Sequence, residues 1–457
     1  MSGEARRLGG SVARVGLDFA ASSPQPVSAD DSLRLSSTPS EIGGANNLRT
    51  AGGFHPVFVE ATVSHPDIVI VGGGIIGSSI AYHLALRKVP VVVVDVAEPV
   101  SSPSASWASA GGVRHQGRDR REWPLTREAS RRWPALEEEL GAPFEFRRGG
   151  HLHVVERDED VRALKERVAR EREGGLDVRI VNPDELRGIA PGITSEARLG
   201  AYSPNDGQAN PRKATRAFAC AAAARGARYR TDCRTIRLER AGDDIQGIVV
   251  DGERIVGGWV VLAAGAWSPR LAGEVGIALA IAPRALQMVL TDLAPPALTP
   301  TVTAMNRRLS LKQLPSGEFL IGGGWPSAID APGTPEMSCH LLPENVDGSW
   351  QVASSVFPPL RARRIVQSWC GLEGEAIDGV PLIGSVPGVR RLYVAAGFSG
   401  HGFQLSPAVG RSVADALLGS EDGALAQLAP SRLAHLDPDE VRAFTAGSTG
   451  RPWGTLG

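Results

Sequence analysis

Residues 68–95 are the part of the sequence that most constrains the fold. An apolar run at 68–71 precedes a Gly-x-Gly-x-x-Gly pattern, which is followed by an apolar-faced stretch ending at Leu86. A second apolar run then ends in Asp95. This order of strand, tight turn, helix, strand and terminal acid is the one that a dinucleotide-binding unit requires. The chain has 54 glycines, so the glycine pattern alone could arise by chance. The dinucleotide-binding unit is predicted because the two apolar strands and the acid lie at the expected distances from the glycine pattern.

Each residue of this pattern has a physical role in such a unit. Gly72 permits the tight turn, Gly74 lets backbone N–H groups approach a pyrophosphate, and Gly77 lets the helix pack closely on the strand. The anion lies at the helix N-terminus, where unpaired N–H groups and the helix dipole favour negative charge. Asp95 ends the second strand about 20 residues further on, where its carboxylate can accept hydrogen bonds from ribose hydroxyls.

Length and composition limit the number of domains and the kinds of partner. The 457 residues exceed one compact core and favour two interleaved domains. A formal net charge of −1 gives no reason to expect nucleic acid or an anionic membrane as a partner. The four cysteines form no Cys-x-x-Cys pair, so we expect reduced thiols, no metal site and a cytoplasmic protein. No apolar run approaches the roughly 18 residues of a membrane helix.

The first 64 residues differ from the rest of the chain. They are rich in Ser, Ala, Gly and Pro and lack helical or strand periodicity, which indicates a disordered extension or a start codon assigned too far upstream. Arg6 and Arg7 precede a mildly apolar stretch that could be read as an export signal. Arg14 and Asp18 interrupt that stretch, so we favour the extension.

The middle of the chain alternates helical and strand patterns. Small residues at 101–114 end in Arg114 and indicate a loop whose backbone passes close to a ligand. Apolar spacing predicts helices at 123–140 and 156–173 and short strands at 145–147 and 151–155. His151 and His153 share one face of the last strand. Without a third ligand nearby we interpret them as polar strand positions and not as a metal pair.

The second half of the chain returns to the first sheet. A helix at 211–225 and an apolar strand running into a small-residue turn at 259–267 indicate a buried parallel strand. Alternating strands at 283–324 indicate an antiparallel sheet, and hence a second domain inserted into the first. A strand at 391–396, a glycine-rich turn and a helix from about 407 to 418 make a second anion-stabilising helix end.

Several motifs together resemble one family. The first glycine pattern with Asp95, the strand 261–267, the segment 369–384 and the turn 397–403 closely resemble the D-amino-acid oxidase superfamily of FAD enzymes. Within it, residues 111–116 resemble the branch that contains the sarcosine oxidase β subunit, the proline dehydrogenase β subunit and glycine oxidase. The similarity spans about residues 66–420.

The resemblance implies an α/β fold with FAD as the cofactor. It implies a discontinuous Rossmann-type FAD-binding domain like that of glutathione reductase, made of 65–118, 203–272 and 366–420. A mixed or antiparallel-sheet substrate domain, made of 119–202 and 273–365, would be inserted into it, and 421–457 would be a C-terminal tail. The residues that we expect to bind FAD are Gly72, Gly74, Ile75, Ile76, Gly77, Asp95, Ser106, Ala110, Gly111, Gly112, Ala264, Gly265, Trp267, Gly371, Gly397, Ser399, Gly400, His401, Gly402 and Phe403.

The resemblance also implies an activity. An amine or amino acid would lose hydride from its α-carbon to flavin N5, giving an imine that water hydrolyses, with no general base needed if the amine binds neutral. Relatives hold the substrate carboxylate with cations, one of them a Lys where this chain has Gln404. Either Arg114 and Lys312 supply the charge or the substrate is not a simple amino acid. We expect His401 to pack against the flavin and tune its potential.

Oxygen use and flavin attachment stay open. No Lys occupies the loosely aligned position of the oxygen-activating Lys in the strand at 319–322, which leaves oxidase and dehydrogenase as alternatives. The Cys that carries a covalent flavin in some relatives aligns with Gly371, next to Cys370, and we interpret Cys370 as an unreactive thiol.

Three other functions compete with amine oxidation. A 2-hydroxy-acid oxidoreductase of the same superfamily would need a base for the hydroxyl proton. An aromatic flavin monooxygenase would usually carry Gly-Asp-Ala before the last helix, where this chain has Gly397-Phe398-Ser399-Gly400. A flavin subunit of a hetero-oligomeric dehydrogenase would pass electrons to a partner that brings its own cluster. The expected partners are therefore a small-molecule substrate and oxygen or another electron acceptor.

Overall fold

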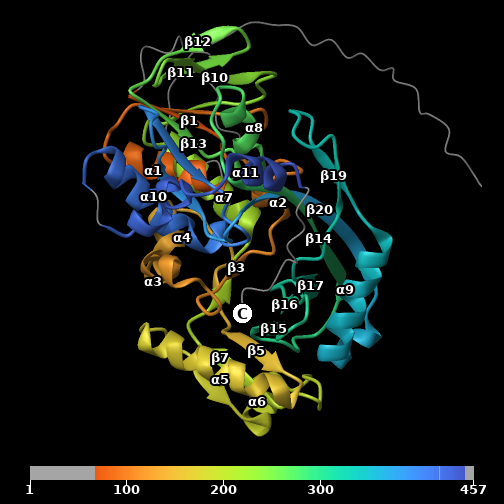
Figure 1. The fold of residues 1–457 in the computed structure, drawn as a ribbon. Helices are drawn as coiled ribbons and strands as arrows, with labels where there is room; N and C mark the ends of the chain where they lie inside the picture. The colour runs from red at the N-terminus through yellow and green to blue at the C-terminus, as the bar shows by residue number, and fades with distance from the viewer. Residues whose placement is uncertain (1–66, 421–422, 448–457) are drawn as a thin grey trace, which may run out of the picture. The chain divides into compact units, whose positions relative to one another are not determined.

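The computed structural model describes residues 67–420 and 423–447. The expectations for residues 1–64 lie outside the described residues. Helices and strands carry the labels of Figure 1.

A six-stranded sheet contains the predicted dinucleotide-binding unit. Its order is β21-β22-β13-β1-β2-β9, and every neighbouring pair is parallel except β21 with β22. This confirms that the strand near 259 returns to the first sheet, where it pairs directly with β1. The strands are β1 (Ile68–Val71), β2 (Val91–Val94), β9 (Arg228–Arg230), β13 (Trp259–Leu262), β21 (Leu382–Ser385) and β22 (Leu392–Ala396).

Both faces of this sheet are covered, which explains why its strands are apolar without alternation. Ile68 and Ile70 pack with α1 (Ile75–Leu86), α7 (Pro211–Ala223) and α10 (Gly402–Leu417). Val69 and Val71 point to the opposite face, because side chains alternate along a strand. That face carries α8 (Ser268–Gly273) and a small antiparallel sheet of β10 (Ile236–Ala241), β11 (Asp244–Val250) and β12 (Glu253–Ile255) (Figure 1).

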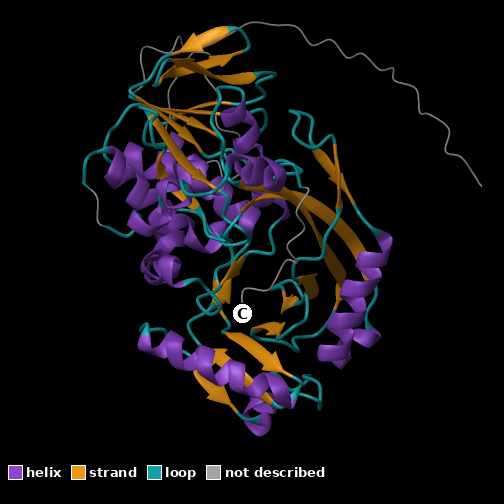
Figure 2. Ribbon diagram, in the orientation of Figure 1, coloured by secondary structure: helices purple, strands orange, loops and turns teal. Residues whose placement is uncertain are grey.

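An eight-stranded mixed sheet forms the other major layer. Its order is β20-β14-β17-β16-β15-β5-β7-β6; β15 and β5 pair in parallel and the other pairs are antiparallel. Long strands β14 and β20 run beside α9, and α5 and α6 lie against the other end (Figure 2). The bounds are β5 (His151–Val155), β6 (Arg179–Val181), β7 (Leu199–Ser203), β14 (Ile281–Leu293), β15 (Thr301–Ala304), β16 (Ser310–Gln313), β17 (Glu318–Gly322), β20 (Ile365–Ala376), α5 (Asp158–Glu173), α6 (Pro183–Ile189) and α9 (Pro343–Val356).

Shorter elements connect these layers. A three-stranded sheet of order β3-β8-β4 lies at the junction, and β18 pairs with β19. These elements are α2 (Ala105–Ala108), β3 (Gly112–Val113), α3 (Trp123–Arg132), α4 (Leu136–Leu140), β4 (Arg147–Arg148), β8 (Gly207–Gln208), β18 (Ala328–Asp330), β19 (Ser338–His340), α11 (Pro438–Thr445) and the 3-10 turns η1 (Arg120–Glu122), η2 (Trp133–Ala135), η3 (Gly265–Trp267), η4 (Pro358–Ala362), η5 (Ala426–Leu428) and η6 (Pro430–Leu433).

Three predicted boundaries differ from the structure. The helix expected at 123–140 is divided into α3 and α4 by the turn η2, because Pro134 cannot donate the hydrogen bond that would continue the helix. The strand expected at 145–147 is shifted and occupies Arg147–Arg148. The helix expected from about 407 begins at Gly402, which places Pro407 inside α10.

Local hydrogen bonds explain how α10 accommodates this proline. Pro407 lacks an N–H, so the carbonyl of Phe403 loses its usual helical donor. The hydroxyl of Ser406 donates to that carbonyl at 2.9 Å, and the hydroxyl of Ser79 on α1 donates to the Ser406 carbonyl at 2.8 Å. The Ser406 hydroxyl therefore replaces the missing backbone donor, and the Ser79 hydroxyl joins α10 to α1.

The proposed division into two interleaved domains stays a prediction. The strands of the six-stranded sheet all come from the segments assigned to FAD binding. The eight-stranded sheet uses the segments assigned to substrate binding together with most of β20 and the end of β7. Residues 423–447, expected as part of a tail, form α11 and two turns, with Leu428 and Phe444 buried.

Candidate cofactor and substrate site

One large cavity of about 1080 Å³ connects the two major sheets. At one end it is lined by the turn after β1 and by Asp95, and at the other by β5, β15 and α5. Small-molecule and cofactor sites usually measure roughly 300–1,000 Å³, so the cavity has room for a large ligand.

The turn after β1 leaves no space for side chains. Gly72 has φ of +108°, and a Cβ there would lie 2.4 Å from the carbonyl oxygen of Ala263. A Cβ on Gly77 would lie 1.9 Å from the carbonyl oxygen of Gly72. Gly72 and Gly74 line the cavity, whereas Gly77 lies behind the turn and allows α1 to approach it. The backbone is therefore exposed to the cavity where an anion can approach it.

Asp95 and Ser106 hold this turn in place. The carboxylate of Asp95 accepts a hydrogen bond from the N–H of Gly73 at 2.6 Å. The Ser106 hydroxyl accepts from the N–H of Ile75 at 2.9 Å, so one N–H of the first helical turn is already paired. Burial raises the pKa of Asp95, although backbone N–H groups act against this shift. Both side chains line the cavity.

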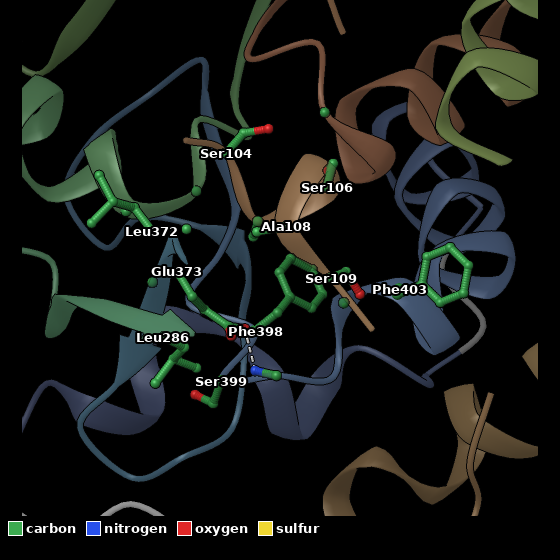
Figure 3. Close-up of a pocket in the computed structure, with 18 of the residues that line it drawn as sticks. Ser104, Ser106, Ala108, Ser109, Leu286, Leu372, Glu373, Phe398, Ser399 and Phe403 are labelled. Atoms are coloured by element: carbon green, nitrogen blue, oxygen red, sulfur yellow. Dashed lines mark hydrogen bonds between the residues drawn. The ribbon is translucent and has the colours of Figure 1, made fainter. Parts of the chain in front are cut away.

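The second glycine-rich turn, at 397–400, meets β20 in the cavity wall. Gly397, Ser399 and Gly400 all have positive φ, and α10 starts two residues later. The N–H of Gly400 donates to the carboxylate of Glu373, which Figure 3 shows directed toward the turn that carries Phe398 and Ser399. Burial raises the pKa of Glu373 to about 7, so this carboxyl changes charge near neutral pH.

His401 lies at the start of α10 and is held by a buried acid. Its Nδ1 is 2.8 Å from Oε1 of Glu122, which is fully buried. Burial and the nearby Arg118 lower the pKa of His401, so the ring is neutral. A carboxylate can only accept, so Nδ1 carries the proton and Nε2 keeps its lone pair.

Arginines dominate the end of the cavity away from Asp95. Arg114, Arg118 and Arg167 all line it. Burial and the nearby Arg114 together lower the pKa of Arg118 to about 9. Of the acids near Arg118, Glu122 and Asp206 lie outside the lining, whereas Glu373 lines the cavity. This end is therefore suited to an anionic ligand group.

The structure brings most of the expected residues into this one cavity. Those that line it are Arg114, Gly72, Gly74, Ile75, Ile76, Asp95, Ser106, Ala110, Gly111, Gly112, Ala264, Gly265, Trp267, Gly371, Gly397, Ser399, Gly400, His401, Gly402 and Phe403.

Lys312 and Gln404 are not among the lining residues. The Lys312 ammonium donates to the Ala110 carbonyl, behind the loop that lines the cavity. The Gln404 side chain donates to the carbonyl of Thr126 and to the hydroxyl of Ser130. A direct contact of either side chain with a ligand in this cavity does not fit these placements.

Sequence reasoning missed Arg118, Arg167, Glu122 and Glu373. Glu373 follows directly after the recognised Trp-x-Gly-Leu motif, and Arg118 lies one helical turn's length after Arg114. Those positions are a weak signal at best. Arg167 lies in a segment that carries only helical patterning and Glu122 lies just before the other predicted helix, in a segment without a motif, so nothing in the sequence assigns them to the cavity.

The cavity fits FAD on its own geometry. A glycine turn that a Cβ on Gly72 would block, a carboxylate just after β2 and a second glycine turn at the start of α10 lie in the same cavity. These are the features that hold the pyrophosphate and ribose of a dinucleotide.

Comparison with known proteins agrees with this geometry. The family model described as FAD dependent oxidoreductase matches residues 67–416. The chain belongs to this family. A glycine oxidase of Geobacillus kaustophilus is 31% identical over 76% of this chain and 92% of its own length. The sarcosine oxidase subunit beta of an Arthrobacter species is 27% identical over 81% of this chain and 92% of its own length.

Solved structures show the same fold. The L-proline dehydrogenase of P. horikoshii matches with a TM-score of 0.74 and 28% identity over 81% of this chain and 98% of its own. The glycine oxidase of Geobacillus kaustophilus matches with a TM-score of 0.71 and 27% identity over 82% of this chain and 100% of its own. This member of the family is thus an FAD-dependent oxidoreductase. Within residues 67–420 and 423–447, no helix combines the length and apolar composition needed to cross a membrane.

Proposed function

We propose that this family member oxidises an amine or amino acid that carries a carboxylate. The C–H bond next to nitrogen breaks and the nitrogen lone pair forms a C=N bond. Water then hydrolyses the substrate imine to a carbonyl compound and an amine. Bound FAD would supply the acceptor for the hydride, at its N5 atom.

The observation that supports this proposal most is the continuity of the cavity. The dinucleotide cradle around Gly72 and Asp95 and the guanidinium groups of Arg114 and Arg118 line the same space. A substrate whose carboxylate is bound by the arginines would therefore extend toward the cofactor end of the cavity. Positioning the substrate in this way is the main contribution of the protein to this chemistry.

Glu373 is suited to handle the amine proton. Most amines are protonated at neutral pH, and an ammonium has no lone pair to form the C=N bond. The Glu373 carboxyl lies in the cavity wall and has a pKa of about 7, so its anionic form can accept that proton. Its other interaction, with the N–H of Gly400, keeps it at the turn before α10.

Anaerobic reduction of the bound flavin tests the proposal. Purified FAD-loaded protein is mixed without oxygen with N-methyl amines, D- and L-amino acids, and 2-hydroxy acids. We expect amines or amino acids to bleach the oxidised flavin band. Bleaching by hydroxy acids alone, with no amine active, would overturn the proposal.

One observation favours a second candidate, oxidation of a 2-hydroxy acid. That reaction needs a base for the hydroxyl proton, and neutral His401, fixed by Glu122, is such a group in the cavity wall. For this function, His401→Gln should slow flavin reduction about 10²–10⁴-fold, the usual value of general base catalysis. For amine oxidation we expect less than a tenfold change.

The electron acceptor and partners complete the proposal. We propose that reduced flavin passes its electrons to oxygen or to a partner subunit, as the similarity to a sarcosine oxidase subunit suggests. The rate of flavin reoxidation after admission of air separates these two acceptors. A cytoplasmic location also stays a proposal; all four cysteines are free thiols, as we expected for it.

A further inference from the structure

The arginine-lined end of the cavity contains more donors than one carboxylate needs. Arg118 lies near His401, since it is among the charges that lower that ring's pKa, and Arg167 on α5 acts in the same way on His153 of β5. Arg114 lowers the pKa of both rings and lines the same cavity. The cationic groups thus extend from the start of α10 to the face of β5.

The two outer arginines are buried and only partly hydrogen-bonded: Nε of Arg118 donates to the carbonyl of Arg114 at 3.3 Å, and Nη2 of Arg167 donates to Oε1 of Gln116 at 3.3 Å. Arg118 is 8% exposed and Arg167 is 7% exposed. In the described part of the chain, Nη1 of Arg118 and Nε of Arg167 have no hydrogen-bond partner. Glu171 forms an ion pair with Arg167, but its Oε1 lies 3.7 Å from Nε, too far to accept a hydrogen bond from that atom. Buried donors left unpaired are costly, which points to a ligand that pairs them.

Two histidines add further unpaired atoms beside Arg167. The Thr303 hydroxyl lies 3.0 Å from Nε2 of His151 and 2.7 Å from Nδ1 of His153. The other ring nitrogens are buried and, among the described residues, have no partner. Burial and the nearby arginines lower the pKa of both rings, so they are neutral. The hydroxyl can donate to one ring only, and that ring then carries its proton on the unpaired nitrogen.

We infer that the substrate carries two anionic groups: Arg114 and Arg118 bind the carboxylate nearer to His401, and Arg167 binds a second carboxylate together with whichever of His151 and His153 carries its proton on the unpaired nitrogen. This inference rests on the proposed function and narrows its substrate class to amino or imino dicarboxylates. The planar guanidinium of Arg167 matches a carboxylate, and the neutral ring that Thr303 orients adds a donor without adding charge.

Binding of anions that cannot be oxidised tests this inference without turnover. Calorimetric titration of the FAD-loaded protein with propionate, succinate and glutarate compares one carboxylate with two. We expect at least one dicarboxylate to bind about tenfold or more tightly than propionate, the value of one added charge-assisted hydrogen bond. Equal affinities for all three anions would overturn the inference.

A matched pair of variants assigns the effect to Arg167. Arg167→Gln should abolish the preference for the dicarboxylate and leave propionate affinity within about twofold. Arg170→Gln removes the same charge from an exposed position of the same helix and should keep the preference. Retention of the dicarboxylate preference in Arg167→Gln would overturn the assignment to Arg167. If that variant does not fold, the titrations of the wild-type protein still decide whether a second anion site exists.

The two proposals fail separately. If flavin is reduced by glycine or N-methylglycine as readily as by dicarboxylates, and succinate and glutarate bind no better than propionate, amine oxidation stands and the second anion site does not. If no amine reduces the flavin while a dicarboxylate still binds tightly, the anion site stands and the proposed reaction does not.

Discussion

Buried ionisable side chains give this cavity its chemistry. Glu373 and Lys312 have pKa values near 7 because burial disfavours their charged forms, and His401 is kept neutral for the same reason. Each is held by a defined partner: the N–H of Gly400, the Ala110 carbonyl and Glu122. Their charge states near neutral pH can therefore be tested one residue at a time.

Glu373 should make anion binding depend on pH. Below about pH 7 its carboxyl is neutral, and above that it is anionic in the same cavity as the ligand. We expect propionate affinity to fall about three- to tenfold between pH 6 and pH 8 in the wild type, because like charges repel. Glu373→Gln should flatten this profile in calorimetric titrations. The same pH dependence in both proteins would contradict the assignment.

Lys312 should make stability depend on pH. Burial lowers the pKa of its ammonium from 10.5 to about 7 in the folded protein. Between these values the unfolded chain binds a proton that the folded one does not, so the Lys312 contribution to the free energy of unfolding becomes more favourable as pH rises. The gain of Lys312→Met over wild type should therefore shrink from pH 7 to pH 10, by up to about 1.4 kcal/mol per pH unit.

Urea unfolding of both FAD-loaded proteins at pH 7, 8.5 and 10 measures this difference. If the two free energies of unfolding stay parallel across the range, Lys312 is not titrating as proposed.

At the scale of elements, close approaches of backbone position the site. α1 packs on β1 through Gly77 and on α10 through Gly410, where a Cβ would lie 2.1 Å from Oγ of Ser79. The predicted unit of β1, turn, α1 and β2 is present in the structure because it depends on local features: continuous apolar runs and glycines at positions where a Cβ would collide with backbone. The start of α10 was predicted five residues late, because the prediction places the helix start at the proline, whereas the Ser406 hydroxyl supplies the donor that the Phe403 carbonyl loses at Pro407.

Gly77→Ala tests the closest approach. Its Cβ would lie 1.9 Å from the carbonyl oxygen of Gly72, so the turn must move. We expect a loss of about 1–3 kcal/mol of stability and a lower FAD content after purification. Thermal unfolding and the visible flavin spectrum measure the two effects.

Gly188→Ala is the matched control for this substitution. Gly188 lies in α6 at an exposed position, and a Cβ there meets no atom within 4 Å. Since alanine favours helix more than glycine does, this variant should be neutral or slightly stabilising. Equal losses of stability and FAD content in Gly77→Ala and Gly188→Ala would contradict the claim that the Gly72 carbonyl leaves no room for a Cβ at position 77.

At the scale of the whole molecule, the cavity wall is shared by both major sheets. Gly72 and Asp95 directly follow strands of the six-stranded sheet, whereas His151, Thr303 and Glu373 lie in strands of the eight-stranded one. A cofactor in this cavity contacts segments that are far apart in the chain, so its binding should stabilise the fold as a unit.

Removal of FAD tests this coupling. Anything that binds the folded state alone stabilises it by about 2.7 kcal/mol at a concentration 100 times its Kd. We expect Tm to fall by several degrees in flavin-stripped protein and to rise with added FAD. NAD at the same concentration is the control. A Tm that does not respond to FAD would contradict cofactor binding in this cavity.

The sequence by itself determined the dinucleotide unit, the return of the chain to its first sheet and the family. These depend on local features: apolar runs, glycines that no side chain could replace and one acid at a fixed distance. Arg114 and the two glycine turns could therefore be assigned to the site in advance.

Only the tertiary structure decided which buried charges meet. Arg167 comes from a helix whose pattern predicts a solvated face, and Glu122 from a turn without a motif, yet Arg167 lies in the cavity wall and Glu122 holds His401 there. Lys312 and Gln404, which we expected at the site, do not line the cavity, because packing directs their side chains to other partners. The direction of a side chain and its distance to groups far away in sequence are set by packing, and a sequence pattern carries neither.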